Sequence, residues 1–421
     1  MRERKLAWHP AFNTVLAYIG VQVGLMTMLS YSASLFMNVI AEDLNTAVGT
    51  TQLRFIPSSL ATIFLLPFCN RIYNKLGFKQ ALSLGAILYA LGYALMSWVP
   101  NVAMYIVCGI PIGLGTALAL FFGGPYMLNA WFDKGTAIAL AIPSAVSSLT
   151  ASFVTPVIQN WIVEWGWRPA LRTAAFVGMG ISVLFVMLFA SAAPETRGLR
   201  PYGWAPSSSE KSGGSRVLSG VRKEHVRKSP VFYMLFAVVM IHAFPGTIMR
   251  YIHPLALNSG FTVDQSTFAV SLFSLATTIT LIAGSVIGNM LGLKKYTLTF
   301  VLINICAYTL TAFNGGNYVL FLIGIAGMAI YGLGQIQQMG AKQIFGTLDL
   351  PEILPLVNIG YNVTNMLASS AIGYVYDFTG SYQAILVAIA VMYAISFGLV
   401  WLIFKKKDTL PWEEKVVEAA K

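Results

Sequence analysis

The sequence has 421 residues, of which 57% are hydrophobic and only 10% are charged. Soluble globular proteins carry about 25% charged residues, so a chain of this composition cannot cover a water-exposed surface and is not a soluble enzyme. The formal net charge is +11. In a soluble protein that charge would suggest a nucleic-acid partner, but none is expected here, because the basic residues flank apolar segments.

Two long runs contain no charged residue at all, Gln80 to Phe132 and Tyr296 to Ala341. Each run is too long for one membrane helix and about right for two, because a bilayer core of about 30 Å needs roughly 20 apolar residues. We therefore predict a helical hairpin in each run. The turns are expected at Pro100-Asn101 and at Asn314-Gly315-Gly316-Asn317, where helix-breaking residues cluster.

Twelve apolar segments follow one another along the chain, at about 13–40, 51–72, 79–99, 101–130, 136–161, 171–193, 231–257, 266–291, 296–313, 317–345, 353–376 and 382–404. A polar stretch rich in Ser, Gly, Lys and Arg separates six segments from six and is expected to be a flexible cytoplasmic linker. The sequence thus predicts an all-α membrane protein of twelve transmembrane helices in two six-helix bundles. The expected domains are a first bundle over 1–193, the linker over 194–230, a second bundle over 231–404 and a cytoplasmic tail over 405–421.

The basic residues predict the orientation, because Lys and Arg are retained on the cytoplasmic side of a membrane. With the amino terminus inside, all but four of the 27 Lys and Arg residues fall in cytoplasmic loops and tails. The exceptions are Arg54, Arg168 and Arg172, expected at interfaces or between helices near the outer ends of segments two and six, and Arg250 in segment seven. We expect a multi-pass protein of the cytoplasmic membrane with both termini in the cytoplasm.

The loop between segments two and three reads Asn70-Arg71-Ile72-Tyr73-Asn74-Lys75-Leu76-Gly77-Phe78-Lys79. It resembles, in degraded form, the Gly-x-Leu-x-Asp-Arg-x-Gly-Arg-Lys signature of the major facilitator superfamily. Lys75, Gly77 and Lys79 fit the signature, whereas Asn74 replaces its carboxylate. Gly77 permits a tight turn. The resemblance implies the major facilitator fold, in which two bundles alternate access to a central site.

Four further stretches resemble the monocarboxylate and oxalate/formate transporter branch of that superfamily: Asn129-Ala130-Trp131-Phe132, Gly166-Trp167-Arg168, Pro194-Glu195 with 198–203, and Asp377-Phe378-Thr379-Gly380-Ser381-Tyr382. Members of this branch commonly hold the substrate carboxylate with a basic residue in segment eight or eleven. In this sequence Thr267 to Leu291 and Ile353 to Tyr376 contain no Lys or Arg. Oxalate is therefore not carried over as the substrate.

Segment seven contains the main candidates for binding and coupling. It places His242, Arg250 and His253 on one helix, which Pro245-Gly246 interrupts. At about 100° per residue, His242 and His253 lie about 20° apart and Arg250 about 60° from His253, so one face of this helix is expected to be cationic. Arg250 then binds an anionic group with His242 as a protonatable partner. Alternatively, Arg250 snorkels to the outer interface and His242 hydrogen-bonds a neighbouring helix.

Uncharged polar residues within the apolar segments complete the expected substrate site. Two pairs at i, i+4 spacing, Tyr18 with Gln22 and Tyr361 with Asn365, each share one helix face. Hydrogen bonds between helices are the alternative role for such residues. The candidates for hydrogen bonding to a polar substrate are Tyr18, Gln22, Tyr126, Asn129, Gln335, Gln338, Tyr361 and Asn365.

No Asp or Glu lies deep in any predicted segment, so the carboxylate proton relay of many symporters has no candidate. Proton coupling would depend on His242, on His253 or on the substrate's own proton. The sequence has no Gly-rich phosphate loop that ends in Lys-Ser/Thr, no metal-ligand cluster and no catalytic triad. We expect no cofactor, no metal and no enzymatic activity.

The preferred function is secondary active transport of a small organic anion, a carboxylate, by antiport, proton-linked symport or uniport. One alternative is an exporter of amphipathic or neutral small molecules, because the aromatic residues, 13% of the chain, and the 17 Met would suit a tolerant cavity. A second alternative is a transport-inactive sensor with a transporter fold. We expect a monomer in the lipid bilayer with a small-molecule substrate.

Overall fold

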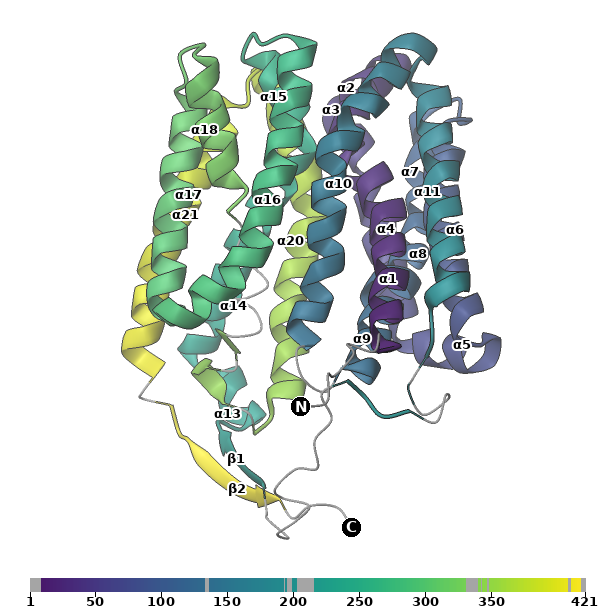
Figure 1. Ribbon diagram of the computed structural model, residues 1–421. Helices are drawn as coiled ribbons and strands as arrows, with labels where there is room; N and C mark the ends of the chain where they lie inside the picture. The colour runs from purple at the N-terminus through teal and green to yellow at the C-terminus, as the bar shows by residue number, and fades with distance from the viewer. Residues whose placement is uncertain are drawn as a thin grey trace, which may run out of the picture. The chain divides into compact units, whose positions relative to one another are not determined.

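The structure is a computed structural model that describes residues 9–132, 136–192, 194, 199–202, 216–330, 340–341, 343–346, 348–407 and 410–417 (Figure 1). The chain divides into two compact units. The first comprises Met1–Trp204 with Thr262–Thr278, and the second comprises Ala205–Phe261 with Ile279–Lys421. Helix α16 (Val263–Leu291) therefore contributes its beginning to the first unit and its end to the second.

The first unit is helical throughout its described part. Two of its helices widen into π-helical stretches, and one contains a short 3₁₀ turn. Its elements are α1 (Ala11–Gln22), η1 (Val23–Tyr31), α2 (Ala33–Asp43), α3 (Val48–Gln52), α4 (Phe55–Leu65), η2 (Leu66–Phe68), α5 (Cys69–Leu76), α6 (Phe78–Met96), α7 (Val102–Val107), α8 (Gly109–Gly115), η3 (Thr116–Gly123), α9 (Gly124–Trp131), α10 (Thr136–Trp165) and α11 (Trp167–Phe189).

The second unit combines helices with one small sheet. Its helical elements are α13 (Lys223–Lys228), α14 (Pro230–Ala243), η5 (Pro245–Tyr251), α15 (Ile252–Asn258), the end of α16, α17 (Leu293–Ala312), α18 (Tyr318–Met328), α20 (Leu350–Thr379) and α21 (Gln383–Lys406). Strand β1 (Arg216–Gly220) pairs antiparallel with β2 (Glu413–Val417). The sheet thus joins a segment of the predicted linker to a segment of the predicted tail, and an ion pair of 2.6 Å between Arg222 and Glu413 adjoins it.

Single residues with left-handed backbone form the sharpest junctions between helices. Gly77, in the superfamily-like loop, has φ +86° and separates α5 from α6. Gly166 has φ +79° and separates α10 from α11. Glycine adopts this conformation without the steric cost that a Cβ brings. The predicted turns are also observed, since Asn101 caps α7 by accepting from Met104 N–H and Asn317 caps α18 by accepting from Val319 and Leu320 N–H.

Eight described helices are long and apolar enough to cross a membrane: Ala11–Tyr31, Val48–Leu76, Phe78–Met96, Val102–Trp131, Ile138–Trp165, Trp167–Phe189, Pro230–Asn258 and Gln383–Lys406. They coincide with predicted segments one to seven and twelve. Helices α16, α17 and α20 occupy predicted segments eight, nine and eleven, and α18 is a shorter apolar helix in segment ten. The multi-pass helical architecture is therefore observed, and the count of twelve spans stays a prediction.

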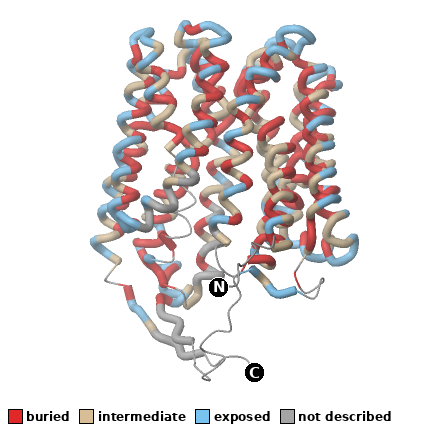
Figure 2. Tube along the Cα trace, viewed as in Figure 1, coloured by how far each residue is buried: buried red, intermediate tan, exposed pale blue. Residues whose placement is uncertain are grey.

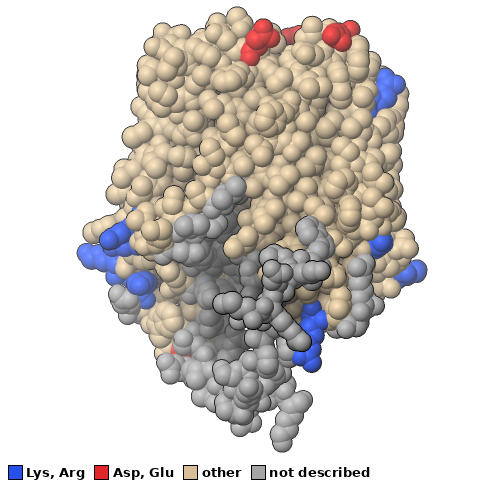
Figure 3. Space-filling model, in the orientation of Figure 1, with Lys and Arg blue, Asp and Glu red and all other residues tan. Residues whose placement is uncertain are grey.

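Apolar residues lie on the outward faces of the helices as well as on the faces that pack in the core. Figure 2 shows buried residues along the inner helix faces and exposed ones on the outer faces and at the helix ends. Many of the exposed side chains are large and apolar, such as Phe64, Phe153 and Met290. In the face shown in Figure 3, described Lys, Arg, Asp and Glu side chains lie near the helix ends, and the band between them is almost free of charge. Such a surface is compatible with lipid and not with water.

Glycine allows helices of the first unit to pack in direct backbone contact. A Cβ built on Gly113 in α8 would lie 2.0 Å from the Ser58 carbonyl oxygen in α4. The Thr62 hydroxyl, one turn along α4, donates a hydrogen bond of 2.9 Å to the Gly113 carbonyl. This contact brings the two helices closer than any residue with a side chain would permit, as is common between membrane helices.

We expect Gly113→Ala to destabilise the folded protein by about 1–3 kcal/mol, because the added methyl group must displace the α4 backbone. Gly180→Ala is the matched control, since a Cβ at Gly180 in α11 meets no atom within 4 Å. Alanine favours helix by about 1 kcal/mol over glycine, so the control should be as stable as the wild type or more so. Thermal unfolding in detergent measures both, and equal melting temperatures would contradict the contact.

Candidate functional site

The segment that carries His242, Arg250 and His253 is broken. Helix α14 ends at Ala243, and Pro245–Tyr251 form the 3₁₀ helix η5 before α15 begins. Proline cannot donate the hydrogen bond that would continue the α-helix. A 3₁₀ helix turns about 120° per residue, so an estimate made for one continuous α-helix does not describe this segment.

Arg250 lies in η5 and contacts helix α20. Its Nη1 and Nη2 both donate to the Asn365 side-chain oxygen, each at 3.3 Å. Asn365 and Tyr361 are partly buried and lie one turn apart on α20, and the Tyr361 phenol interacts with the Arg250 charge and with the Asn365 side chain. Three of the candidates from the sequence therefore lie together in the second unit. The arrangement offers a guanidinium, an amide and a phenol, which are groups that bind oxyanions.

His242 faces other helices. It is fully buried, and its Nε2 lies 2.7 Å from the Ser396 hydroxyl of α21. Its ring packs against Phe300 and Tyr393, at centroid distances of 5.8 Å and 5.2 Å. Nδ1 has no hydrogen-bond partner among the described residues. The expected single cationic face is therefore not seen, because His242 contacts α17 and α21 whereas Arg250 contacts α20.

His253, the second candidate for coupling, lies in α15, two residues after the end of η5. Its side chain is buried, with 5% of its surface exposed. It belongs to the same compact unit as Arg250 and His242.

The polar pair in α1 has the predicted geometry. The Gln22 side-chain nitrogen donates to the Tyr18 hydroxyl at 3.0 Å, and Tyr18 donates to the Leu120 carbonyl in η3 at 3.1 Å. The Tyr18 ring also packs where a side chain at Gly124 would lie. This pair therefore connects helices within the first unit, which is the alternative role that the sequence left open.

The remaining candidates are not brought together with this pair. Tyr126 is exposed and stacks on Phe122 at a centroid distance of 5.3 Å, and Asn129 is also exposed. Gln335 and Gln338 lie outside the described residues. Among the described residues no group of three or more His, Cys, Asp or Glu could hold a metal ion.

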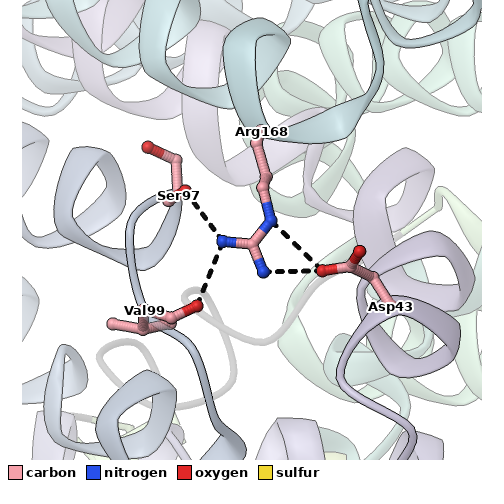
Figure 4. Close-up of polar contacts among 4 residues, drawn as sticks. All are labelled: Asp43, Ser97, Val99 and Arg168. Atoms are coloured by element: carbon pink, nitrogen blue, oxygen red, sulfur yellow. Dashed lines mark hydrogen bonds and ion pairs between the residues drawn. The ribbon is translucent and has the colours of Figure 1, made fainter.

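Arg168 makes several polar contacts within the first unit (Figure 4). Its Nε and Nη2 donate to one Asp43 carboxylate oxygen, at 3.2 Å and 2.7 Å. Its Nη1 donates to the Ser97 and Val99 carbonyls, at 3.1 Å and 3.0 Å, as Figure 4 shows. One side chain thus connects the start of α11, the end of α2 and the turn after α6. The predicted inter-helix contact of Arg168 is observed.

Arg54 makes contacts between helices, which is one of the two placements expected from the sequence. Only 5% of its surface is exposed, and its guanidinium lies over the rings of Phe55, Tyr93 and Tyr105. A cation in such surroundings is unusual within a membrane protein and marks a site of interest. The neighbouring Tyr and Phe, which surround it in three dimensions, were not recognised from the sequence as one cluster.

An open pocket of about 430 Å³ lies at the surface of the first unit, between α10 and the beginning of α16. Its walls combine aromatic and aliphatic residues with polar ones, including Phe153, Phe268, Gln159 and Asp264. Cavities of about 300–1,000 Å³ with such mixed walls accommodate small organic molecules. No sequence motif indicated this pocket.

The sequence profile of the Major Facilitator Superfamily matches residues 19–342, about three quarters of the chain. The chain belongs to this superfamily.

Within the Major Facilitator Superfamily the chain resembles the monocarboxylate transporters. It is 22% identical to Monocarboxylate transporter 12 of Mus musculus over 382 residues, which are 83% of this chain and 76% of the relative. It is 25% identical to Monocarboxylate transporter 14 of Homo sapiens over 123 residues, or 29% of this chain, and this match spans only 24% of that relative's length. The resemblance inferred from the motifs is thus confirmed.

Solved structures share the superfamily's fold. A bacterial homolog of the human lysosomal transporter Spinster, in an inward-facing and unoccupied conformation, has a TM-score of 0.69 at 13% identity, with 96% of this chain and 99% of that chain covered. The nucleoside transporter NupG has a TM-score of 0.68 at 11% identity, with 94% and 100% covered. At these identities the similarity concerns the fold alone, and it confirms the predicted major facilitator fold.

The geometry of Arg168 predicts a ranking of variants. Arg168→Gln should cost about 1–3 kcal/mol, because it leaves the Ser97 and Val99 carbonyls without their donor. Asp43→Ala should cost at most about 1 kcal/mol, because the ion pair is partly exposed, with 33% and 41% of the two side-chain surfaces accessible. Thermal unfolding in detergent measures both values. Arg222→Gln, which breaks an exposed ion pair, is the control for loss of charge and should have almost no effect. A larger cost for Asp43→Ala than for Arg168→Gln would refute the importance of the carbonyl contacts.

Proposed function

We propose that this superfamily member is a secondary active transporter that moves a small organic anion, a carboxylate, across the cytoplasmic membrane by alternating access. The contact of Arg250 with Asn365 is the observation that carries the proposal. A guanidinium matches a carboxylate with two parallel hydrogen bonds. The names of the monocarboxylate transporter relatives support the same substrate class.

The chemistry of the Arg250 contact favours a binding role over a purely structural one. Asn365 accepts through an amide oxygen, which carries no net charge. A substrate carboxylate can displace the amide and gain a charge-assisted hydrogen bond that the amide does not provide. Tyr361, beside both groups, supplies a phenolic donor to the same anion.

Transport by this site would proceed as antiport, uniport or proton-linked symport. For proton linkage the candidates are His242 and His253, since histidine changes charge near physiological pH. His242 is the stronger candidate because its Nδ1, buried beside aromatic rings, has no partner among the described residues. We further propose a monomer with both termini in the cytoplasm, as the distribution of basic residues predicts.

Arg250→Ala should lower carboxylate uptake about tenfold to a hundredfold at unchanged folded yield, because one charge-assisted contact contributes about 1.5–3 kcal/mol. Asn365→Asp should raise KM at least about tenfold, because a fixed carboxylate competes with the substrate for Arg250. Uptake into proteoliposomes measures both. Arg222→Ala, which removes an exposed arginine outside the spans, is the control and should transport normally. Normal uptake by Arg250→Ala would remove this residue from the site.

His242→Gln should flatten the pH dependence of uptake, because glutamine keeps hydrogen bonding but cannot take up a proton. Ser396→Ala is the matched variant. It removes the hydrogen bond to His242 but keeps the titrating ring, so its uptake should still depend on pH. Initial uptake rates over a series of pH values give the result. An unchanged profile in His242→Gln would show that the coupling proton binds elsewhere.

A second candidate function is export of amphipathic or neutral molecules, and the 430 Å³ pocket of the first unit favours it. Phe153 and Phe268 offer apolar contacts, and Asp264 and Gln159 offer polar ones. Saturable uptake of a neutral amphipath, without uptake of carboxylates, would support this alternative. A complete lack of counterflow over a broad metabolite panel would instead support a sensor with a transporter fold.

A further inference from the structure

The first unit contains a buried cation that no described carboxylate neutralises. Arg54 precedes α4 as its N-cap residue, and 5% of its surface is exposed. No Asp or Glu of the described residues lies within ion-pair distance of it. Tyrosine side chains surround the guanidinium, and Tyr93 hydrogen-bonds to it, but these groups are neutral. Burying a charge without an opposite charge is costly for a folded protein.

The groups around Arg54 compensate this charge only in part. Its guanidinium carbon lies 4.6 Å, 5.4 Å and 5.9 Å from the ring centroids of Phe55, Tyr93 and Tyr105. Its Nη1 lies 4.0 Å from the sulfur of Met96, which is a weak acceptor. Its buried Nε has no hydrogen-bond partner among the described residues. Aromatic faces attract a cation but do not accept all five of its N–H groups.

A small cavity adjoins this cation. It has about 10 Å³ of free space. Arg54, Gln52, Tyr93, Tyr105 and Met96 line it together with aliphatic and aromatic residues of α2 and its neighbours. This volume admits one small ion or one water molecule and excludes the carbon chain of an organic acid. The Gln52 side-chain nitrogen donates to the Thr51 hydroxyl at 3.0 Å, and its second N–H remains available to an occupant.

Two donors face the same small space. The guanidinium of Arg54 and the available amide N–H of Gln52 act in the same direction and favour an anion.

We propose that the cavity between Arg54 and Gln52 binds one small inorganic anion of halide size. The anion accepts from the unpartnered Nε of Arg54 and neutralises the buried charge, so its binding stabilises the first unit. A water molecule, which would fit the same space and bridge Arg54 Nε to the unpartnered Oε1 of Gln52, leaves the charge uncompensated. This site is distinct from the one at Arg250 and does not depend on the proposed function.

Chloride is the probe for a direct test. The melting temperature of the purified full-length protein in neutral detergent is measured in sodium chloride and in sodium gluconate of equal ionic strength. Gluconate is too large for the cavity. Because a ligand that binds only the folded state raises apparent stability, chloride and bromide should stabilise the wild type saturably. If the melting temperature is the same in chloride and in gluconate, the occupant is water and the anion site is refuted.

Three variants show whether the stabilisation by chloride depends on the cavity beside Arg54. Gln52→Glu places a carboxylate next to Arg54 and so supplies the negative charge that chloride would bring. Its melting temperature in gluconate should therefore equal that of the wild type in chloride. Its apparent affinity for chloride should be at least about tenfold lower than that of the wild type. Arg54→Gln should lose the response as well, and Gln52→Glu keeps the test valid if Arg54→Gln does not fold. Arg250→Ala should keep the full chloride response. A response that persists in Gln52→Glu but disappears in Arg250→Ala would assign the anion to Arg250 and overturn the proposal.

Discussion

The cost of placing a charge in hydrocarbon governs this structure more than any other constraint. The outer faces of the helices are apolar, and in the view of Figure 3 the described charged side chains lie near the helix ends. An arginine within or near the spans must then find partners in the protein. Arg168 finds a carboxylate and two carbonyls, Arg54 finds aromatic rings, and Arg250 contacts an amide. These different partners leave the three guanidinium groups with different capacities to bind an anion.

The same constraint acts on the backbone, because an unpaired carbonyl in hydrocarbon is also costly. The π-helical stretch η3 departs from the regular hydrogen-bond pattern in the middle of a membrane helix. Two tyrosines donate to its carbonyls: Tyr73 to Leu118 at 2.8 Å and Tyr18 to Leu120 at 3.1 Å. The irregular helix and the buried hydroxyl groups thus satisfy each other. Irregular membrane helices are tolerated where such partners exist, and they often occur at functional positions.

The sequence predicted those features that depend on local chemistry. Apolar length predicted the helical spans, and helix-breaking residues predicted the turns at Asn101 and Asn317. The i, i+4 rule placed Tyr361 and Asn365 on one face, where both are found beside Arg250. These predictions succeeded because the period of an α-helix is fixed once the segment is helical.

The sequence could not predict features that depend on tertiary packing. The single face expected for His242 and Arg250 assumed one regular α-helix. The 3₁₀ helix η5, which follows Phe244, has a different rotation per residue, so Arg250 points in another direction than an α-helix would give it. The aromatic cluster around Arg54 was not predicted, because the rings that form it come from residues far apart in the chain, such as Tyr93 and Tyr105. Which helices lie side by side is decided by the fit of their surfaces, and no local pattern records that fit.

The distances around the arginines fit the proposal that Arg250, and not Arg168, binds the substrate. Arg168 contacts a carboxylate at 2.7 Å, which is typical of a charge-assisted hydrogen bond, and it also donates to the Ser97 and Val99 carbonyls. Arg250 contacts the Asn365 amide at 3.3 Å, at the long end of the hydrogen-bond range. A transporter must release its substrate as well as bind it. In the proposed transport cycle, the long contacts of Arg250 with the neutral Asn365 amide exchange for contacts with a substrate carboxylate and re-form when the substrate leaves.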